Sequence, residues 1–400
     1  MLALLAMAEL LGMSLWFAAS AVSAQYQLLW KLTASETAWL TTIVQLGFVL
    51  GTAVSAMLNI ADIVPAKRLF AAGAIVGAVA NAAIVWAPGY SIALLCRLIT
   101  GAALAAVYPP ALKMISTWFR ARRGLAVGTI VGALTIGKAL PYLVHAFPGA
   151  GIRPVLLTSS IGAAVGALLV SGWYGDGPFP FPSRPFSWGL VGSIVRERRW
   201  RLATGGYLGH MAELYSAWTW LPVFIAASIA MERSGAGTVA RTAPALASGI
   251  AFAVLAIGGA GCVWGGVVAD RRGRAWLVSR AMAISGTCAV VIGLTFGRSL
   301  WLLVPVALVW GFFIIADSAQ FSVLVTESVP AHAVGTALTL QTSLGFLLTM
   351  VTIQLIPPIV QLVGWRWAFT FLAIGPAFGI ASIRRLVAHG ATPVELSTRE

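Results

Sequence analysis

The sequence predicts an all-α membrane protein with twelve transmembrane helices, divided into two similar halves of six. Three observations predict this fold class. The composition is strongly apolar, the apolar residues form twelve separate stretches of helix length, and short motifs recur at corresponding places in the two halves.

The composition excludes a soluble protein. Of 400 residues, 59% are hydrophobic and only 10% are charged, which is too few to cover a water-exposed surface. The net charge of +14 would suggest a nucleic-acid partner if the basic residues formed one patch, but they are spread over short loops between apolar stretches. We therefore expect no nucleic-acid partner. The three cysteines lie inside apolar stretches, so we expect neither a disulfide framework nor a metal site.

Twelve stretches are long enough to cross a hydrocarbon core of about 30 Å as helices. Helices are expected because a spanning segment must satisfy its backbone hydrogen bonds internally. The first stretch begins MLALLAMAELL, without the basic start and cleavage site of a removable signal peptide. The predicted spans are residues 1–24, 37–60, 68–87, 91–115, 124–147, 152–174, 201–228, 243–267, 275–296, 299–325, 333–359 and 364–386.

Basic residues predict the orientation of these spans. With both termini inside, the inner loops and tail carry seventeen Lys and Arg residues and the outer loops carry six. Because basic residues are retained on the cytoplasmic side, this bias predicts a multi-pass protein of a bacterial cytoplasmic (inner) membrane with both termini in the cytoplasm.

The longest polar segment divides the chain into its halves. We expect a first six-helix bundle over residues 1–174, a cytoplasmic linker over 175–200, a second bundle over 201–386 and a cytoplasmic tail over 387–400. Apolar residues recur at helical spacing in the linker before the basic run RERRWR, which predicts an amphipathic helix on the membrane surface, with a plain linker as the alternative.

The halves also share motifs. MAEL occurs at residues 7–10 and again at 211–214, and the pair Ala-Asp occurs at 61–62 and 269–270. Matches in the same order at a nearly constant offset indicate a duplicated six-helix unit, and equal orientation of the copies makes it a parallel repeat about an axis along the membrane normal.

Two motifs resemble those of a known family of secondary transporters. Segment GGVVADRRGR (265–274) is similar to the cytoplasmic gating motif of the major facilitator superfamily, and an arginine followed four residues later by glycine, Arg97 and Gly101, is similar to its motif in the fourth span. The stretch 116–144 resembles the branch of cyanate and nitrate/nitrite porters. The gate residues that the resemblance indicates are Asp62, Gly266, Asp270, Arg271, Gly273 and Arg274.

This resemblance implies two bundles around a central cavity, a monomer, and alternating access of a solute to the two sides. It also implies that Asp270 accepts hydrogen bonds from the start of a neighbouring helix and from the arginines after it, which would hold the cytoplasmic side closed. The alternative for DRRGR is a basic loop that only orients the spans.

Five charged residues lie deep in predicted spans, namely Glu9, Arg97, Lys138, Glu213 and Asp317. A charge at bilayer depth costs roughly 2.5 to 3.5 kcal/mol on insertion scales, so each needs a partner, a polar cavity or a function. Glu9 and Glu213 occupy matching places in spans 1 and 7, which line the central cavity in the family that the chain resembles.

The acids and bases each have a functional and a structural interpretation. Glu213, with His210 one turn away, and Glu9 are predicted to bind a proton or substrate, because a carboxylate taken out of water holds a proton more readily. Arg97 is predicted to attract an anion or to act on a proton-carrying acid, and Lys138 to contact an anion or to pair with one of the glutamates. Asp317 is predicted to bind a proton or substrate on a wetted face of span 10. The structural alternatives are that these residues bond neighbouring helices.

Aromatic residues accompany the charges, and small residues suggest where helices touch. The predicted cavity aromatics are Trp16, Tyr108, Tyr142, Tyr215 and Trp220, together with Trp218. Glycines spaced by four predict close helix contacts at Gly73 and Gly77, at Gly124, Gly128 and Gly132, at Gly162 and Gly166, and at Gly261 and Gly265.

These features predict a secondary active transporter that moves a small, anionic solute, coupled to protons and without cofactors. GALTIGKA (132–139) resembles a phosphate-binding loop, but it has Ala139 where Ser or Thr would hold magnesium and it lies in a membrane span, so nucleotide binding is rejected. The alternative is a proton-driven exporter of apolar or cationic compounds, and a non-transporting sensor is a further one. An enzyme is not expected, because no set of nucleophile and base stands out.

Overall fold

The structure is helical throughout its described part. It is a computed structural model, which describes residues 1–119, 123–179, 186–233 and 243–390, without the side chains of residues 61, 62, 123, 233, 243 and 390. The first half contains α1 (Leu2–Met13), α2 (Ala18–Ala21), α3 (Ser23–Trp30), α4 (Ala34–Met57), α5 (Ile60–Ile63), α6 (Ala66–Ala83), η1 (Ile84–Trp86), α7 (Tyr90–Leu104), α8 (Tyr108–Ser116), α9 (Arg123–His145) and α10 (Ile152–Trp173). The second half contains α11 (Trp188–Arg196), α12 (Arg198–Arg233), α13 (Ala243–Arg272), α14 (Arg274–Val291), η2 (Ile292–Thr295), α15 (Leu300–Ala316), α16 (Ser318–Thr326), η3 (Ala331–Ala333), α17 (Val334–Val363), α18 (Trp365–Ala368), η4 (Thr370–Ala373) and α19 (Ile374–Gly390).

The predicted membrane spans correspond closely to these helices. Within the described ranges, eleven helical segments are long and apolar enough to cross a membrane, and their ends lie within five residues of the predicted ends. The all-α membrane fold class is therefore confirmed. Apolar sequence predicts span positions well because a helix in lipid satisfies its own backbone.

The first predicted span, residues 1–24, is not one continuous helix. The helix α1 ends at Met13, and α2 begins only at Ala18. At the break, Ser14 Oγ donates a hydrogen bond to the carbonyl of Leu11 over 2.7 Å, and the carbonyls of Leu15 and Trp16 accept hydrogen bonds from Arg97. The chain therefore leaves helical geometry at this point because side chains bond the freed backbone groups.

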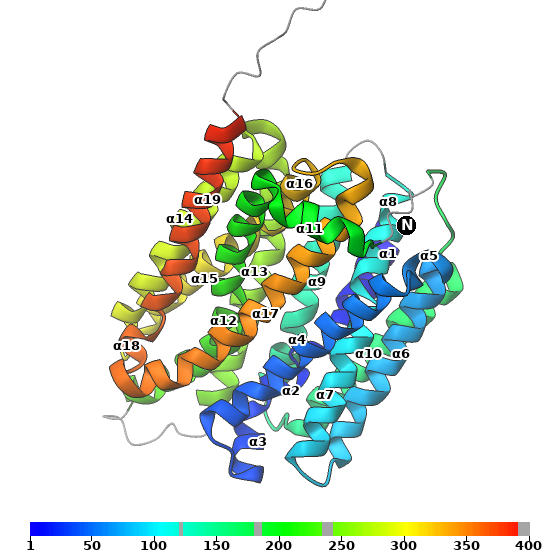
Figure 1. Cartoon of the computed structure of the whole chain (residues 1–400). Coiled ribbons are helices and arrows are strands. Elements are labelled where there is room, and N and C mark those ends of the chain that lie inside the picture. The colour runs from blue at the N-terminus through cyan, green and yellow to red at the C-terminus, as the bar shows by residue number, and fades with distance from the viewer. Residues whose placement is uncertain (120–122, 180–185, 234–242, 391–400) are drawn as a thin grey trace, which may run out of the picture.

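The helices form two groups that meet along two helix pairs. We call α1–α10 the first bundle and α12–α19 the second bundle; α11 lies between them in sequence. At their junction α9 packs along α13, and α4 packs along α17. Figure 1 shows the first bundle in blue and cyan beside the second in green to red, with Met1 and the end of α19 at the same end of the molecule. We call that end the terminal face and the other the opposite face.

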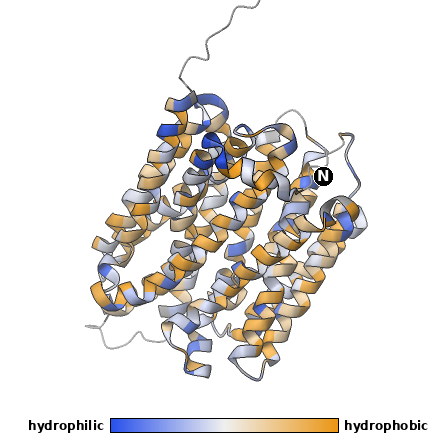
Figure 2. Cartoon of the chain, in the orientation of Figure 1, coloured by the Kyte–Doolittle hydropathy of each residue, from blue (hydrophilic) through white to orange (hydrophobic). Residues whose placement is uncertain are grey.

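Hydrophobic and hydrophilic residues are also distributed between the helix middles and the two faces. Hydrophobic residues line the helices along their length, and hydrophilic residues gather at the helix ends, most densely at the terminal face (Figure 2). This distribution is the one expected for a molecule whose helix flanks contact lipid tails.

Glycines bring particular helices together, as the spacing predicts. A Cβ on Gly261 or Gly265 of α13 would lie 2.3 or 1.9 Å from a carbonyl oxygen of α15. Gly73 in α6 approaches α7, and Gly166 in α10 approaches α1, with carbonyl oxygens at 2.7 and 2.9 Å from the added Cβ. The predicted close contacts at Gly73, Gly166, Gly261 and Gly265 are therefore confirmed, whereas Gly124 approaches only the side chain of Asp270 among the described residues, at 3.5 Å from an added Cβ.

Candidate functional site

Lys138 lies at the point where the two bundles meet. It belongs to α9, is buried, and its Nζ donates a hydrogen bond to the hydroxyl of Tyr215 in α12 over 2.5 Å. The ammonium also lies 4.1 Å from the ring centroid of Trp16, 4.8 Å from that of Tyr215 and 5.6 Å from that of Trp218. A desolvated cation gains about 2 kcal/mol or more from such ring faces, so aromatic groups take the place of an acidic partner here.

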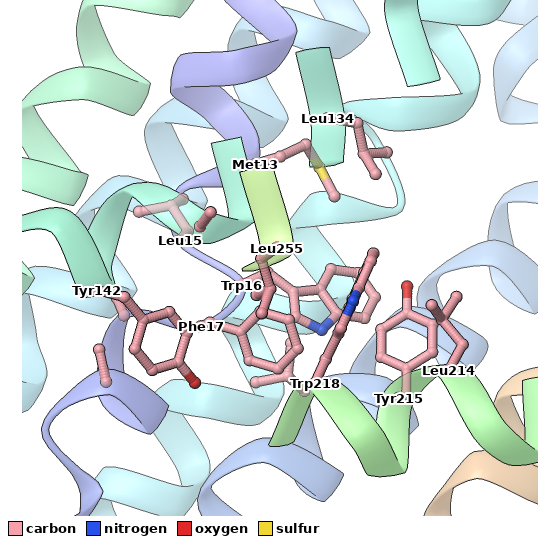
Figure 3. Packing of buried hydrophobic residues seen from close by; sticks show 14 of the residues in the cluster. Met13, Leu15, Trp16, Phe17, Leu134, Tyr142, Leu214, Tyr215, Trp218 and Leu255 are labelled. Carbon is pink, nitrogen blue, oxygen red and sulfur yellow. The ribbon is translucent and has the colours of Figure 1, made fainter. Parts of the chain in front are cut away.

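The rings around Lys138 come from both bundles and pack on one another. Trp16 contacts Tyr215 at a centroid distance of 5.7 Å, and Phe17 contacts Trp218 at 6.2 Å. Phe346 from α17 lies 5.2 Å from Tyr215. Figure 3 shows Trp16, Phe17, Tyr215 and Trp218 gathered in one cluster. We call the rings of Trp16, Tyr215 and Trp218 around Lys138 the central aromatic cluster.

Several hydrogen-bond donors at the central aromatic cluster lack an acceptor among the described residues. The indole Nε1 atoms of Trp16 and Trp218 and the hydroxyl of Tyr142, one turn from Lys138 on α9, are buried without a partner among the described residues. A buried polar group without a hydrogen bond costs roughly 1 to 3 kcal/mol. Their convergence with an ammonium leaves a set of donors that an acceptor-rich ligand would satisfy.

Glu9 is a buried acid without hydrogen bonds. It is 0% exposed, and neither carboxylate oxygen has a hydrogen-bond partner in the described part of the chain. The Glu9 carboxylate interacts electrostatically with the Lys138 ammonium and with the phenol of Tyr108. Glu9 and Lys138 are therefore brought into one site, although they form no direct ion pair.

Glu213 has a different environment from Glu9. Its carboxylate accepts hydrogen bonds from Trp310 Nε1 in α15 over 2.7 Å and from Ser285 Oγ in α14 over 2.8 Å. Both partners belong to the second bundle, so Glu213 does not face Glu9 across the centre as the matching positions suggested. Sequence equivalence places the two carboxylates on equivalent helices, but Glu213 accepts hydrogen bonds from donors of its own bundle and Glu9 has none among the described residues.

His210 pairs with Asp317 rather than with Glu213. The His210 Nδ1 lies 3.0 Å from an oxygen of Asp317, both side chains are buried, and Nε2 of His210 has no described partner. Asp317 lies between α15 and α16, at the break of the tenth span. The acids and the histidine of α12, α15 and α16 thus form a polar cluster inside the second bundle, and Asp317 acts electrostatically on Glu213.

Arg97 holds the first bundle together in this structure. Its guanidinium donates to the backbone carbonyls of Leu40, Leu15 and Trp16, at 3.0, 2.9 and 2.5 Å. The side chain is 0% exposed and forms no ion pair with a described carboxylate. The structural alternative for Arg97 therefore has direct geometric support, because its donors are occupied by backbone carbonyls, two at the break in the first span and one in α4.

The predicted cavity aromatics separate into two places. Trp16, Tyr142, Tyr215 and Trp218 lie at or next to the central aromatic cluster, and Tyr108 is partly exposed at the start of α8. Trp220 instead donates its Nε1 to the carbonyl of Ile353 in α17 over 2.9 Å and packs on Trp365. It bonds two helices of the second bundle and lies outside the cluster.

The loop motif forms only part of its expected contacts among the described residues. The Asp270 carboxylate lies at the first turn of α9, 3.5 Å from where a Cβ on Gly124 would be. Arg274 pairs with Glu327 over 2.8 Å, a partner that the motif did not indicate, and Gly273 takes φ +89°, a conformation that favours glycine. A Cβ added at Gly266 would lie 3.7 Å from the carbonyl oxygen of Gly124. The Asp62 side chain lies outside the described residues, and the role of Arg271 stays a prediction.

Polar residues that the sequence analysis did not single out join the bundles at the opposite face. Ser35 Oγ of α4 donates to Gln354 Oε1 of α17 over 2.7 Å, and Thr349 donates to Gln45. His145 at the end of α9 lies 2.7 Å from Ser248 Oγ in α13. Uncharged polar residues are common at span ends, so nothing in one sequence could have marked these as bundle contacts.

Comparison with known proteins agrees with this architecture. The family model described as Major Facilitator Superfamily matches residues 2–353. The chain belongs to the Major Facilitator Superfamily. A crystal structure of a mutant of the nucleoside transporter NupG is similar in fold, with a TM-score of 0.69 at 16% sequence identity, covering 97% of this chain and 99% of that chain. No curated protein sequence matches.

Membership in the Major Facilitator Superfamily confirms the predicted family and identifies the chain as a multi-pass membrane transporter and not an enzyme. The cyanate and nitrate/nitrite branch stays a prediction. In the described part of the chain no group of His, Cys, Asp and Glu residues has the arrangement of a metal site.

Proposed function

We propose that this Major Facilitator Superfamily protein is a proton-coupled secondary active transporter that moves a small anionic solute by alternating access. The anion binds at Lys138 within the central aromatic cluster. The observation that carries this proposal is the convergence of a buried ammonium with two indole donors, Trp16 and Trp218, that have no acceptor.

The position of Lys138 fits a substrate site for a second reason. Its only hydrogen bond to a described residue crosses from the first bundle to Tyr215 of the second, so a ligand that takes over this ammonium also changes how the bundles are joined. A site shared by two bundles at the middle of the membrane is the arrangement in which rocking of one bundle against the other exposes a solute to each side in turn.

Glu9 is proposed as the coupling acid. It is buried without a hydrogen bond to any described residue, and its carboxylate is attracted by the ammonium of Lys138. Binding of an anion at Lys138 would weaken the attraction that keeps Glu9 ionised. An anion at the ammonium and a proton at Glu9 therefore favour each other, which is the linkage that symport requires. His210, Asp317 and Glu213 form a second buried cluster able to hold a proton.

The contacts at the opposite face support a conformation closed on that side, with α4 bonded to α17 and α9 to α13. We propose that the terminal face is cytoplasmic and that the membrane is the inner membrane of a bacterium, because the basic residues favour the loops on that side.

One observation favours the alternative of an exporter for apolar or cationic compounds. The rings that surround the Lys138 ammonium would also surround an organic cation that displaced it. The fold similarity to NupG, a nucleoside transporter, adds an uncharged aromatic solute to the compounds that an assay should include.

The experiment is solute uptake by the purified protein in liposomes with an imposed proton gradient. A panel of small inorganic and organic anions, one nucleoside and one organic cation is compared for the native chain, Lys138→Gln and Lys138→Arg. We expect gradient-driven uptake of an anion that falls by at least about tenfold in Lys138→Gln, since loss of a charge-assisted hydrogen bond removes about 1.5 kcal/mol or more. Lys138→Arg should retain part of it.

The matched control is Lys31→Gln, because Lys31 is exposed at the end of α3. It should transport like the native chain. Anion uptake that persists in Lys138→Gln would remove Lys138 from the substrate site, and uptake of the cation or the nucleoside alone would replace the proposed substrate class.

A further inference from the structure

Two arginines and a tryptophan form an exposed group where α13 turns into α14. Arg272 is the last residue of α13, and Trp276 and Arg280 lie in the first two turns of α14. The arginines are exposed and Trp276 is 39% exposed. All three belong to the terminal face of the second bundle, outside the proposed transport site.

Both guanidinium groups lie within cation–π distance of the Trp276 ring. The Cζ atom of Arg272 lies 5.0 Å from the ring centroid of Trp276, and that of Arg280 lies 5.7 Å from it. Two like charges on one ring repel each other, and a cation–π contact at an exposed site contributes only about 0.5 to 1 kcal/mol each. An anion held by both guanidiniums would compensate the repulsion.

No described carboxylate takes that role. The nearby arginine of the same turn, Arg274, is the one that pairs with Glu327, over 2.8 Å. The Asp270 carboxylate lies against the first turn of α9, at Gly124. Among the residues that the structure describes, no carboxylate therefore occupies the donors of Arg272 and Arg280.

The place of the group at the start of a span indicates which kind of anion it would meet. α14 opens a span that runs from Arg274 to Thr295, and it packs within its bundle on α15 and α19, which leaves its outer side to lipid. Tryptophan favours the headgroup level of a bilayer, and arginine near a helix end extends its guanidinium to that level. The phosphate of a phospholipid lies there, and the arginine fork matches phosphate oxygens.

We infer that Arg272, Trp276 and Arg280 form a binding site for the headgroup of an anionic phospholipid at the terminal face. The two guanidiniums bind the phosphate, and the exposed ring lies beside the glycerol and the upper acyl chain. A zwitterionic lipid is bound less tightly, because its amine is repelled by the second arginine.

The test is native mass spectrometry of the purified full-length chain in detergent with an equimolar mixture of phosphatidylglycerol and phosphatidylethanolamine. The native chain should retain phosphatidylglycerol in preference. Arg272→Gln with Arg280→Gln removes both guanidiniums that bind the phosphate, so it should lower the ratio of the two bound lipids by about thirtyfold, equivalent to about 2 kcal/mol.

The matched control is Arg298→Gln with Arg366→Gln, two exposed arginines at the opposite face of the same bundle. This pair should leave the ratio unchanged within about twofold of the native value. An unchanged ratio in the Arg272 and Arg280 variant, or an equal fall in both double variants, would overturn the site. Displacement of the lipid by millimolar inorganic phosphate would overturn the lipid assignment in favour of a general phosphate site.

Discussion

At the scale of single residues, the buried charges differ most in what satisfies them. Arg97 donates to three backbone carbonyls and Glu213 accepts from two side chains, whereas Glu9 has no hydrogen bond to any residue that the structure describes. Charges whose hydrogen bonds are satisfied, as at Arg97 and Glu213, contribute to folding. A charge without such partners, as at Glu9, remains available for protons or ligands. Substitutions should therefore separate them by stability and by transport.

Arg97→Ala should destabilise the chain strongly. The substitution leaves the carbonyls of Leu15, Trp16 and Leu40 buried without their donor, at roughly 1 to 3 kcal/mol for each. We expect an apparent melting temperature in detergent at least about 5 °C below that of the native chain, measured by tryptophan fluorescence. Arg366→Ala, at an exposed site, is the control; similar melting of the two variants would mean that Arg97 does not hold the break of the first span.

Glu9→Gln and Glu213→Gln should have opposite effects. At Glu213 an amide replaces an acceptor that faces two donors, so one of the bonds from Trp310 and Ser285 is lost, at about 1 to 3 kcal/mol of stability. At Glu9 no bond is lost, and stability should be unchanged or higher. Transport should show the reverse order, because Glu9→Gln removes the proposed coupling proton.

The measurement is uptake in liposomes with and without a proton gradient, paired with thermal melting. Glu9→Gln is expected to keep exchange of solute across the membrane but to lose accumulation driven by the gradient. The exposed Glu232→Gln is the control for loss of a carboxylate. Gradient-driven accumulation by Glu9→Gln would assign coupling to another group, with Asp317 and His210 next in line.

The sequence located these charged residues but could not pair them. The cost of a charge in lipid singles out Glu9, Arg97, Lys138, Glu213 and Asp317 from composition alone. The partners of Arg97, Glu213 and Lys138 are backbone carbonyls, an indole, a hydroxyl and a phenol, which occur throughout the chain and carry no pattern of their own. Only the packing of helices far apart in sequence brings them together.

At the scale of helices, the same contact recurs in both halves. Gly47 and Gly51 of α4 lie against carbonyl oxygens of α7, and Gly261 and Gly265 of α13, each 214 residues later, lie against carbonyl oxygens of α15. The span positions could be predicted from apolar length, and the duplication of the six-helix unit from the recurring MAEL and Ala-Asp motifs, but the equivalence of these glycine contacts was not predicted. The break in the first span could not be predicted, because it depends on Arg97 from α7.

Alanine at these glycines should disturb a helix pair. A Cβ on Gly101 of α7 would lie 2.0 Å from the carbonyl oxygen of Val44, and one on Gly47 would lie 2.1 Å from that of Leu98. Backbone cannot move aside as a side chain can, so Gly101→Ala should cost about 3 kcal/mol or more. The measurement is the melting temperature and the yield of folded protein in detergent.

Gly172→Ala is the matched control, since nothing lies within 4 Å of its added Cβ near the end of α10. Alanine is favoured over glycine by about 1 kcal/mol in a helix interior, so this variant should be as stable as the native chain or more so. A stable Gly101→Ala would mean that α4 and α7 can separate without loss, contrary to their close packing.

At the scale of the whole molecule, the bundles are joined in different ways along their length. The described hydrogen bonds between α4 and α17 come from Ser35, Thr42 and Gln45 in the half of α4 nearer the opposite face. Towards the terminal face the residues of α4 include the exposed side chains of Leu50 and Val54. Uncharged hydrogen bonds at this closed side can break and form again at modest cost, since each contributes only about 0.5 to 1.5 kcal/mol.

Fixing this side closed should stop transport. Ser35 and Gln354 lie on different bundles and touch through a 2.7 Å hydrogen bond, so Ser35→Cys with Gln354→Cys places two thiols within reach of a short bifunctional maleimide. Alternating access requires this contact to open once in each cycle, so we expect uptake in liposomes to fall to background after cross-linking and the uncross-linked double variant to remain active. The single variants treated with the same reagent control for modification alone; Cys262 and Cys288 are buried and Cys96 lies partly buried in α7. Full uptake by the cross-linked chain would show that solute passes without separation of α4 from α17 at the opposite face, and a rocking motion of the bundles would then have to be replaced by a local movement within one of them.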